Sequence, residues 1–388
     1  MKKINKKITI FITHSIGELD VLFPLLFAIK DEYAVDIEMV FCVEKVYQDY
    51  LSNAFYLFCS EKISISVSYT QLPNKIDSKF RKSNPSLLER ITLKLYINLL
   101  IARKSYYLLK KIIYSDVVMH EISNVYTATK PIYWVNAWNE KKIFTYHHGH
   151  AIIISSAAAE ARRKVKFSDR VTLLNFHKHN ERNARAQGFV NQFFIGYPKF
   201  FNTWISTVSK YSKAKYSKDD RKCVVIYTRG VHEYYMDKDK YEFLLVSSYK
   251  TVRSILGDVE IIVKPHPREC LSFINQIIDK ISGKNIHISL EHSGVIASNA
   301  ILAITLFNSC LLDSLSLGVP SVEYYIEAEK FREVEPNGSS YRNMGVDSVS
   351  NPNSLKLFIN NVVLGKYKIP NHIKDLSEHK DISFMDLI

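Results

Sequence analysis

Short runs of apolar and β-branched residues alternate with longer segments of helical periodicity along most of the chain. This alternation predicts strands connected by helices, the pattern of an α/β protein with parallel sheets. The first run, Lys7–Thr13, is expected to be a buried strand, and Gly17–Lys30 the helix after it. Further strands of the first half are expected at Val35–Cys42, Ile63–Ser68, Ile132–Val135, Lys142–Tyr146, Val171–Asn175 and Gln192–Ile195.

The alternation pauses at residues 206–220, a polar stretch rich in Lys and Ser that we interpret as a linker. We therefore predict two tandem Rossmann-like domains, residues 1–205 and 221–365, with an interdomain cleft and a tail at 366–388. Ligands of such doubly wound sheets bind at the carboxyl ends of the strands, so the residues after each strand are the candidates for function. Strands of the second domain are expected at Cys223–Tyr227, Val259–Val263, Ile286–Ser289, Ala300–Leu306 and Ser321–Tyr325.

Residues 86–113 break the alternation with one long basic amphipathic segment, which is either a single helix or a pair of helices broken near Lys104. Its apolar positions recur at helical spacing, Lys and Arg stand between them, and Pro85 sits at the first turn, where proline is tolerated. Two interpretations remain open. Either the helix packs on the sheet of its own domain with a solvated basic side, or it docks on an anionic membrane surface.

The composition excludes several classes of protein. Apolar residues make up 47% and charged residues 23% of the 388 positions, which is ordinary for a globular chain and excludes collagen-like, low-complexity and disordered proteins. The 52 Lys and Arg against 39 Asp and Glu give a net charge of +13, which attracts nucleotides, nucleic acid or an anionic membrane. The basic residues are dispersed and form no recognition-helix, RNP or OB signature, so nucleic acid is not expected as a partner.

Cysteine spacing and the N-terminal sequence indicate the compartment. The five cysteines are widely spaced and include no zinc-like pair, which fits a reducing cytoplasm. The apolar run Ile8–Ile12 is shorter than the roughly 7–15 residues of a signal-peptide core, and no stretch reaches the roughly 18 apolar residues of a membrane span. We expect a cytoplasmic protein, soluble or peripheral on the inner face of the cytoplasmic membrane.

The sharpest local signal is the sequence VKPHPRE, which follows the strand at Val259–Val263. Proline on both sides of His266 restricts the backbone there, so an imidazole is held rigidly at the carboxyl end of a strand. Such a ring can donate a hydrogen bond to a phosphate, and Lys264 and Arg268, on either side of His266-Pro267, add positive potential. The alternative is a turn histidine whose hydrogen bonds are satisfied by the backbone.

A second signal follows the strand at Ala300–Leu306. Asn308 or Ser309 can cap the next helix, and a helix N-terminus with free N–H groups attracts anions. Asp313 lies one turn after Ser309, where it can face the same cleft and accept hydrogen bonds from a ribose diol. The simpler alternatives are a helix cap without a ligand and a solvated carboxylate.

The loop after the first strand of the second domain contains Thr228, Arg229 and Gly230. By topology it faces the cleft. Gly230 allows close backbone approach, and the Arg229 guanidinium can clamp a leaving phosphate. The alternative is an exposed loop cation without a ligand.

Together, KPHP and the SLGVP tail of the next helix resemble the second domain of GT-B glycosyltransferases of bacterial surface polysaccharide synthesis. The resemblance is to HP-motif enzymes that use CMP-activated acidic sugars, the sialyl-, polysialyl- and Kdo-transferases. It extends to CDP-glycerol glycerophosphotransferases and UDP-N-acetylglucosamine 2-epimerases, and it covers residues 221–330. It implies that His266 binds the donor phosphate, that Ser309 adds hydroxyl and N–H contacts, and that Asp313 takes the ribose.

The first domain is expected to hold the acceptor and the catalytic base. Glu18 and Asp20 follow the first strand in the sequence GELD, whereas the sialyl-type enzymes carry an acidic pair followed by Gly, which this chain lacks. His148 lies in YHHGH after the strand Lys142–Tyr146 and resembles the His-Gly of the glycerophosphotransferases. Glu18, Asp20 and His148 are therefore all candidates. No carboxylate or cysteine is spaced to complete a metal site with these histidines, so no metal and no cofactor is expected.

The sequence thus predicts a metal-independent glycosyltransferase that moves a sugar, with a CMP-activated acidic sugar favoured, from its nucleotide to a glycan or lipid-linked glycan acceptor. A glycerophosphotransferase and a 2-epimerase share the scaffold. The epimerase is disfavoured because the first domain shows no clear carboxylate set. A non-catalytic basic module that binds membrane or nucleic acid is the alternative of a different class.

Overall fold

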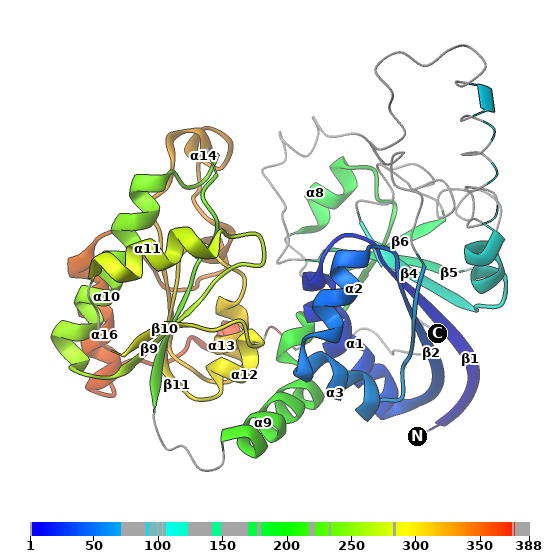
Figure 1. The fold of residues 1–388 in the computed structure, drawn as a ribbon, viewed down its shortest axis with the longest axis horizontal. Coiled ribbons are helices and arrows are strands. Elements are labelled where there is room, and N and C mark those ends of the chain that lie inside the picture. Colours follow the sequence, from blue (N-terminus) through cyan, green and yellow to red (C-terminus); the bar gives the residue numbers. More distant parts are fainter. Residues whose placement is uncertain are drawn as a thin grey trace. The chain divides into compact units, whose positions relative to one another are not determined.

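The computed structural model describes residues 2–70, 106–122, 142–148, 170–176, 180–216, 222–232, 234–281 and 285–374, together with positions 91, 92, 95, 99, 103 and 376. The described chain forms two compact units, the first ending at Ile195 and the second beginning at Gly196. Within the described residues, no helix is long and apolar enough to cross a membrane. Each unit is a parallel sheet with helices on both faces (Figure 1).

The sheet of the first unit has seven strands in the order β3-β2-β1-β4-β5-β6-β7, all paired in parallel. The chain runs outward from β1 to β3 and then returns to β4 on the other side of β1, so the strand order reverses between β1 and β4. The strands are β1 (Lys2–Ile12), β2 (Tyr33–Phe41), β3 (Ser66–Tyr69), β4 (Val117–Glu121), β5 (Lys142–Tyr146), β6 (Val171–Asn175) and β7 (Asn191–Phe194).

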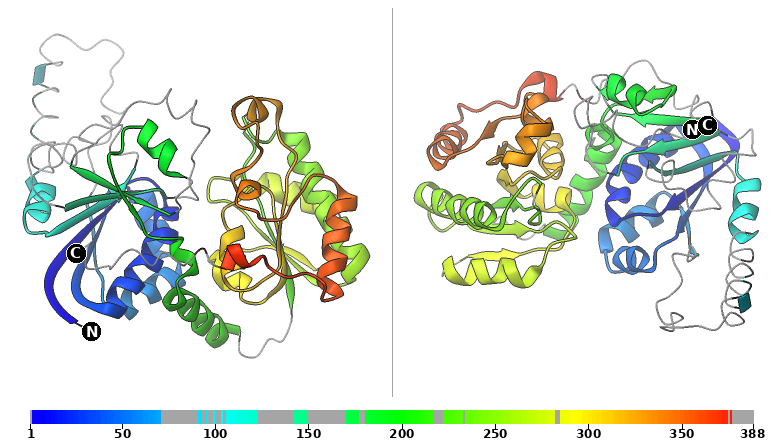
Figure 2. Two further views of the ribbon diagram at one scale, coloured as in Figure 1. Left: turned by 180° about the vertical axis from the view of Figure 1, so that it is seen from behind. Right: turned by 90° about the horizontal axis from the view of Figure 1, so that it is seen from above.

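Helices cover both faces of this sheet (Figure 2). One face packs a buried cluster in which Phe11, Val118 and Ile143 from the strands meet Leu108 and Ile112 from a helical segment at 106–113. The other described helices of the unit are η1 (Ile16–Glu18), α1 (Leu19–Glu32), α2 (Glu44–Leu51), α3 (Ala54–Lys62) and α8 (Glu181–Ala186).

The sheet of the second unit has six parallel strands in the order β10-β9-β8-β11-β12-β13, with the reversal between β8 and β11. Every residue of β8 is buried because helices lie on both of its faces, which explains the unbroken apolar run CVVIY. The strands are β8 (Cys223–Tyr227), β9 (Glu260–Lys264), β10 (Ile286–Ile288), β11 (Ala300–Thr305), β12 (Ser321–Tyr324) and β13 (Ser348–Val349).

Alternate residues of β8 face two different cores. Val224 and Ile226 pack with residues of α10, α11 and α16, whereas Val225 and Tyr227 pack with Ile296 of α12 on the opposite face. The helices are η4 (Pro198–Phe200), α9 (Asn202–Tyr216), α10 (Lys238–Leu256), α11 (Leu271–Ile281), α12 (Ser293–Ala297), α13 (Leu311–Ser316), α14 (Glu329–Val334), α15 (Ser340–Asn343), α16 (Pro352–Val363) and α17 (Asn371–Lys374).

The structure corrects the linker expected at 206–220, because residues 206–216 belong to α9 in the second unit. Trp204, Thr207, Val208 and Ser212 form its buried stripe at helical spacing. Two of the four are small and polar, so the stripe reads as hydrophilic in the sequence. The Ser212 hydroxyl donates to the carbonyl of Val295 at 3.2 Å, which ties the helix to α12.

A strand that was not expected from the sequence, β4, lies next to β1 at the centre of the first sheet. Its sequence VVMHE ends in two polar residues, and a strand with polar residues in the fully buried centre of a sheet lacks the unbroken apolar signature. The strand expected at Ile132–Val135 lies outside the described residues.

Candidate active site

Glu18 closes the loop that follows β1. Its carboxylate is fully buried, and Oε1 accepts hydrogen bonds from the backbone N–H groups of Thr13 (3.0 Å), His14 and Ser15 (3.1 Å). Oε2 accepts a hydrogen bond from the Tyr146 hydroxyl at 2.8 Å. Burial, with a smaller contribution from the charge of Glu121, raises the pKa of Glu18 to about 7, although the loop N–H donors oppose this shift. Both carboxylate oxygens of Glu18 thus accept hydrogen bonds within the protein, one from its own loop and one from β5.

His148 and Glu121 form a histidine–carboxylate pair at the point where the strand order reverses. Glu121 is the last residue of β4, and its Oε1 lies 3.0 Å from Nδ1 of His148, which follows β5. The His148 side chain is 22% exposed and that of Glu121 only 2%. A carboxylate on Nδ1 holds the proton there and leaves Nε2 as a proton acceptor, which a general base requires. The His14 ring lies beside that of His148, with 4.5 Å between centroids.

Asp20, the third candidate in this unit, lies in the first turn of α1. Its Oδ1 accepts a hydrogen bond from the Tyr56 hydroxyl of α3 at 2.6 Å. This contact joins two helices, which gives Asp20 a structural part in the unit. Of the three candidates for the base, His148 is the one whose surroundings match the chemistry.

In the second unit, the loop after β9 fixes the ring of His266. Nδ1 of His266 accepts a hydrogen bond from the backbone N–H of Arg268 at 3.2 Å. The neutral ring therefore carries its proton on Nε2, where it can be donated to an anion. The backbone N–H of His266 donates to the Glu269 carboxylate, which also accepts the Thr228 hydroxyl at 2.7 Å. Burial is the main cause that raises the pKa of Glu269.

Two residues of the loop after β8 contact Glu269. The Thr228 side chain is buried, and its hydroxyl donates a hydrogen bond to Glu269. A Cβ at Gly230 would lie 3.3 Å from Cγ of Glu269, so glycine at this position makes room for that carboxylate. Thr228 and Gly230 therefore support the His266 loop through Glu269.

Arg229 is held between two aromatic rings. Its guanidinium carbon lies 4.5 Å from the ring centroid of Tyr235 and 5.2 Å from that of Phe307. Stacking fixes the plane of the guanidinium without using its N–H donors. Within the described part of the chain, the buried Nε atom has no hydrogen-bond partner. Arg229 is therefore suited to binding an anion at the carboxyl end of β8.

The residues after β11 have different roles. Asn308 is buried; its Oδ1 accepts the N–H of Cys310 at 3.1 Å and its Nδ2 donates to the carbonyl of Thr228, so it ties two loops together. Ser309 is partly exposed, and its hydroxyl makes no hydrogen bond to any other described residue. That leaves the Ser309 hydroxyl as the side chain here with capacity for a ligand.

The expected contact of Asp313 with a ribose is not supported. Asp313 is buried, and its Oδ2 accepts hydrogen bonds from Nζ of Lys199 at 2.7 Å and from the Ser293 hydroxyl at 2.9 Å. A buried carboxylate that is paired with a lysine remains with that partner, because unpairing the lysine costs several kcal/mol, about 3–5. Asp313 therefore stabilises the packing of η4 and α12 against α13.

Other cations of the β9 loop stay near its surface. Lys264 is partly buried and its Nζ lies 3.4 Å from the carbonyl of Pro265, while Pro267 and Arg268 are exposed. The contribution of Lys264 and Arg268 to the positive potential beside His266 stays a prediction from the sequence.

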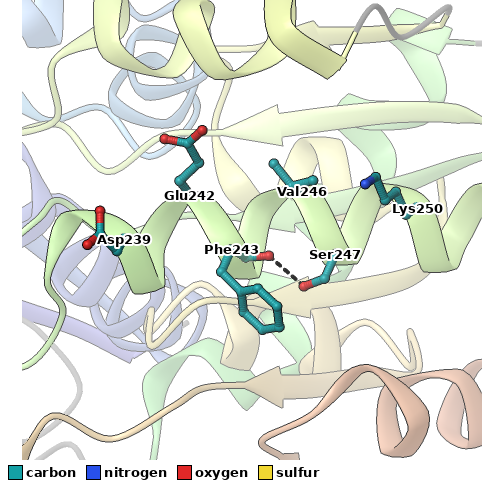
Figure 3. Close-up of a pocket in the computed structure, with 6 residues that line it drawn as sticks. All are labelled: Asp239, Glu242, Phe243, Val246, Ser247 and Lys250. Atoms are coloured by element: carbon teal, nitrogen blue, oxygen red, sulfur yellow. Dashed lines mark hydrogen bonds between the residues drawn. The ribbon is translucent and has the colours of Figure 1, made fainter.

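A separate pocket lies along α10 (Figure 3). All of its lining residues come from this one helix, and none of them follows a strand. It contains none of the candidate residues, so it is separate from the candidate active site. Its lining residues are Asp239, Glu242, Phe243, Val246, Ser247 and Lys250.

No family model and no curated protein matches this sequence. Solved structures match over nearly the whole chain. UDP-GlcNAc 2-epimerase from Methanocaldococcus jannaschii has a TM-score of 0.55 at 15% identity, with 95% of each chain covered. The Neisseria meningitidis enzyme of the same name, bound to UDP-GlcNAc, has a TM-score of 0.51 at 12% identity, covering 98% of this chain and 95% of that one. UGT73P12 from Glycyrrhiza uralensis, complexed with glycyrrhetinic acid 3-O-monoglucuronide, has a TM-score of 0.52 at 10% identity, covering 97% and 90%.

The chain has the GT-B fold. In each of its Rossmann-like units the candidate side chains gather where the strand order reverses, which is where ligands of such sheets bind. The first GT-B unit places Glu18 and the His148–Glu121 pair there. The second places Arg229, His266 and Ser309 around the ends of β8, β9 and β11.

Sequence reasoning missed two carboxylates of this GT-B chain, Glu121 and Glu269. Glu121 ends a strand that was not expected, and Glu269 follows the HP sequence without any spacing rule that marks it. If β4 had been identified as a central strand, its last residue, Glu121, would have been placed at the carboxyl ends of the strands, beside His148. Within the described residues, no three His, Cys, Asp or Glu side chains are grouped to hold a metal ion.

Proposed function

We propose that the chain is a glycosyltransferase that moves a sugar from a nucleotide-activated donor to a hydroxyl of a bacterial surface glycan. The observation that carries this proposal is the His148–Glu121 pair, with 3.0 Å between Nδ1 and Oε1. A buried carboxylate that orients a partly exposed imidazole is the arrangement that deprotonates a hydroxyl. The GT-B fold, shared with a structure bound to UDP-GlcNAc, supports a nucleotide-sugar donor.

The second unit is proposed to hold the donor. Nε2–H of His266 donates to the phosphate, the Ser309 hydroxyl adds a contact, and the stacked Arg229 guanidinium balances its charge. These donors are fixed before the substrate arrives, so they stabilise the charge that develops on the leaving phosphate without first having to reorganise. We propose that they serve in place of a metal ion, which activity in the presence of a chelator tests.

In the first unit, Nε2 of His148 accepts the proton of the acceptor hydroxyl as the oxygen attacks the anomeric carbon of the sugar. The new bond from carbon to the acceptor oxygen forms, and the bond from carbon to the phosphate oxygen breaks. The nucleotide leaves with that electron pair. Glu121 stabilises the imidazolium that results, because its carboxylate stays on Nδ1.

For the donor we propose a CMP-activated acidic sugar, and for the acceptor a lipid-linked glycan at the inner face of the cytoplasmic membrane. The KPHP sequence at 264–267 supports the choice of nucleotide through its resemblance to the HP-motif enzymes. Thermal unfolding with CMP, CDP and UDP tests it, because a ligand that binds only the folded chain raises the melting temperature. Stabilisation by CMP above UDP supports the donor, and the reverse order contradicts it.

Release of the nucleotide from donor and acceptor tests the transferase itself. His148→Ala and Glu121→Gln are expected to lower turnover by about two orders of magnitude or more. The matched control is His287→Ala, because His287 also lies near a glutamate, with 3.7 Å to Glu260, but on β10, the outermost strand of the second sheet. Equal turnover of all three variants would contradict the assignment of the base.

A 2-epimerase is the second candidate, and one observation favours it. The sequence shows no clear carboxylate set in the first domain, but the structure corrects this, since Glu18 and Glu121 are both buried at one edge and interact electrostatically. Incubation with UDP-GlcNAc in deuterated water, without an acceptor, distinguishes the two reactions. Appearance of the C2 epimer with deuterium at C2 supports the epimerase, and an unchanged substrate supports the transferase.

A further inference from the structure

The described residues between 91 and 113 lie in two opposite environments, one buried and one exposed. Every one of these described positions is helical, namely 91, 92, 95, 99, 103 and 106–113. Leu108 and Ile112 are fully buried and pack with Phe11, Val118 and Ile143 of the sheet. This inner face anchors the helix to the first unit (Figure 1, cyan). The interpretation of the helix as one that packs on its own sheet therefore holds for these residues.

The opposite face is apolar and exposed. We call it the outer stripe, and it comprises Ile91, Leu95, Leu99, Tyr106 and Ile113. Ile91, Leu95 and Leu99 are four residues apart, and Tyr106 and Ile113 are seven apart; both are spacings that repeat on one side of a helix with 3.6 residues per turn. Leu99 is 69% exposed and Tyr106 is 70% exposed, values far above those of an ordinary packed side chain. Isolated apolar residues are common on surfaces, but five exposed apolar side chains at these helical spacings mark a binding surface.

Positive charge borders the outer stripe. Arg103 and Lys110 are exposed and lie next to it around the helix. In the sequence, residues 86–113 contain six Lys or Arg and a single acidic residue, Glu89. A helix with an apolar row flanked by cations fits a surface that offers hydrocarbon and negative charge together.

We propose that the outer stripe docks on an anionic lipid bilayer, with its apolar side chains at the level of the headgroups and acyl chains. Such helices lie in the plane of the interface, and anionic lipids add attraction for each basic residue near the surface. A second copy of the chain fits less well, because a two-fold contact sets each patch against itself and would face these cations with each other. This inference goes beyond the proposed reaction and does not depend on it.

Sedimentation with vesicles tests the proposal, using the whole chain and two vesicle compositions: phosphatidylcholine alone, and phosphatidylcholine with phosphatidylglycerol. We expect binding to the anionic vesicles that weakens as salt is added, and at least about tenfold weaker binding for the double variant Leu99→Glu and Tyr106→Glu. The matched control is Leu357→Glu and Leu364→Glu, which places the same charges at two exposed leucines of the second unit, each 63% exposed. The control should bind as the wild type does.

Three results would overturn the proposal. These are no binding to the anionic vesicles, equal binding to both compositions, or equal loss of binding in the control variant. A dimer in analytical ultracentrifugation that the outer-stripe variant abolishes, without any binding to vesicles, would assign the surface to a second copy instead. Nucleotide-induced stabilisation of the outer-stripe variant should equal that of the wild type, so failure here is distinguishable from failure of the proposed reaction.

Discussion

Replacement of Glu18 by glutamine should change how stability depends on pH. The pKa of Glu18 is raised from its ordinary value of 4.5 to about 7. A carboxyl whose pKa is higher in the folded state than in the unfolded chain stabilises the fold only while it is protonated. The contribution of Glu18 to the free energy of unfolding is therefore complete below about pH 4.5, is lost between about pH 4.5 and 7, and stays lost above that range.

The size of this loss follows from the two pKa values. Each pKa unit corresponds to about 1.4 kcal/mol, so raising the pKa of Glu18 from 4.5 to about 7 amounts to roughly 3 kcal/mol. A glutamine side chain at this position would keep the contacts, because its amide oxygen accepts from the loop N–H groups and its NH₂ donates to the Tyr146 hydroxyl oxygen. Glutamine has no proton to lose. The free energy of unfolding of Glu18→Gln, relative to that of the wild type, should therefore rise by roughly 3 kcal/mol between about pH 5 and pH 8.

Hydrogen exchange with mass spectrometry measures this change in the free energy of unfolding. Exchange is compared at about pH 5 and pH 8, on either side of the pKa in the folded state, after correction for the intrinsic exchange rate at each pH. Peptides covering residues 8–41 report on the first unit and peptides covering 223–263 on the second. Glu323 is the control, since burial raises its pKa to about 7 in the second unit, and Glu323→Gln should affect only peptides of that unit. The reasoning would be refuted if the free energy of unfolding of Glu18→Gln differed from that of the wild type by the same amount at both pH values. Strong destabilisation at both values would mean that the loop needs the charged carboxylate.

The other predictions concern the site and one buried ion pair. Glu121→Gln should lower turnover by about 10²–10⁴-fold with little change in melting temperature, because the amide no longer holds the proton on Nδ1 of His148; steady-state kinetics and calorimetry check this. His266→Ala should lower turnover by about two orders of magnitude or more, as when one donor to a developing charge is lost, and full turnover would contradict the phosphate role. Asp313→Asn should lower the free energy of unfolding, measured with urea, by about 3–5 kcal/mol, because it leaves Lys199 unpaired. Adding Lys199→Met should restore much of this free energy.

The layers of the fold could be predicted from the sequence because parallel strands buried on both faces must be apolar throughout. Cys223–Tyr227 shows this directly, and the strand appears where it was expected. The strand at Val117–Glu121 was not predicted, because its last two residues are polar although they are buried. The helix at Asn202–Tyr216 was not predicted, because serine and threonine make up half of its buried stripe.

The site could be predicted only as far as chain topology determines it. His266 and His148 stand at strand ends because the sequence places each directly after a strand. Asp313 shows the limit of this reasoning: helical spacing put it near the site, but the carboxylate pairs with Lys199, which is 114 positions away in sequence. Spacing describes one element at a time, whereas such a partner comes from another element.

Calorimetric titration of CMP into the wild type, His266→Ala and His287→Ala tests the central claim most directly, namely that His266 holds the phosphate of the donor. A hydrogen bond to a charged group contributes about 1.5–3 kcal/mol, so His266→Ala should bind CMP roughly 10–100 times more weakly. His287→Ala should bind it as the wild type does. Equal affinity of the wild type and His266→Ala for CMP would contradict the account.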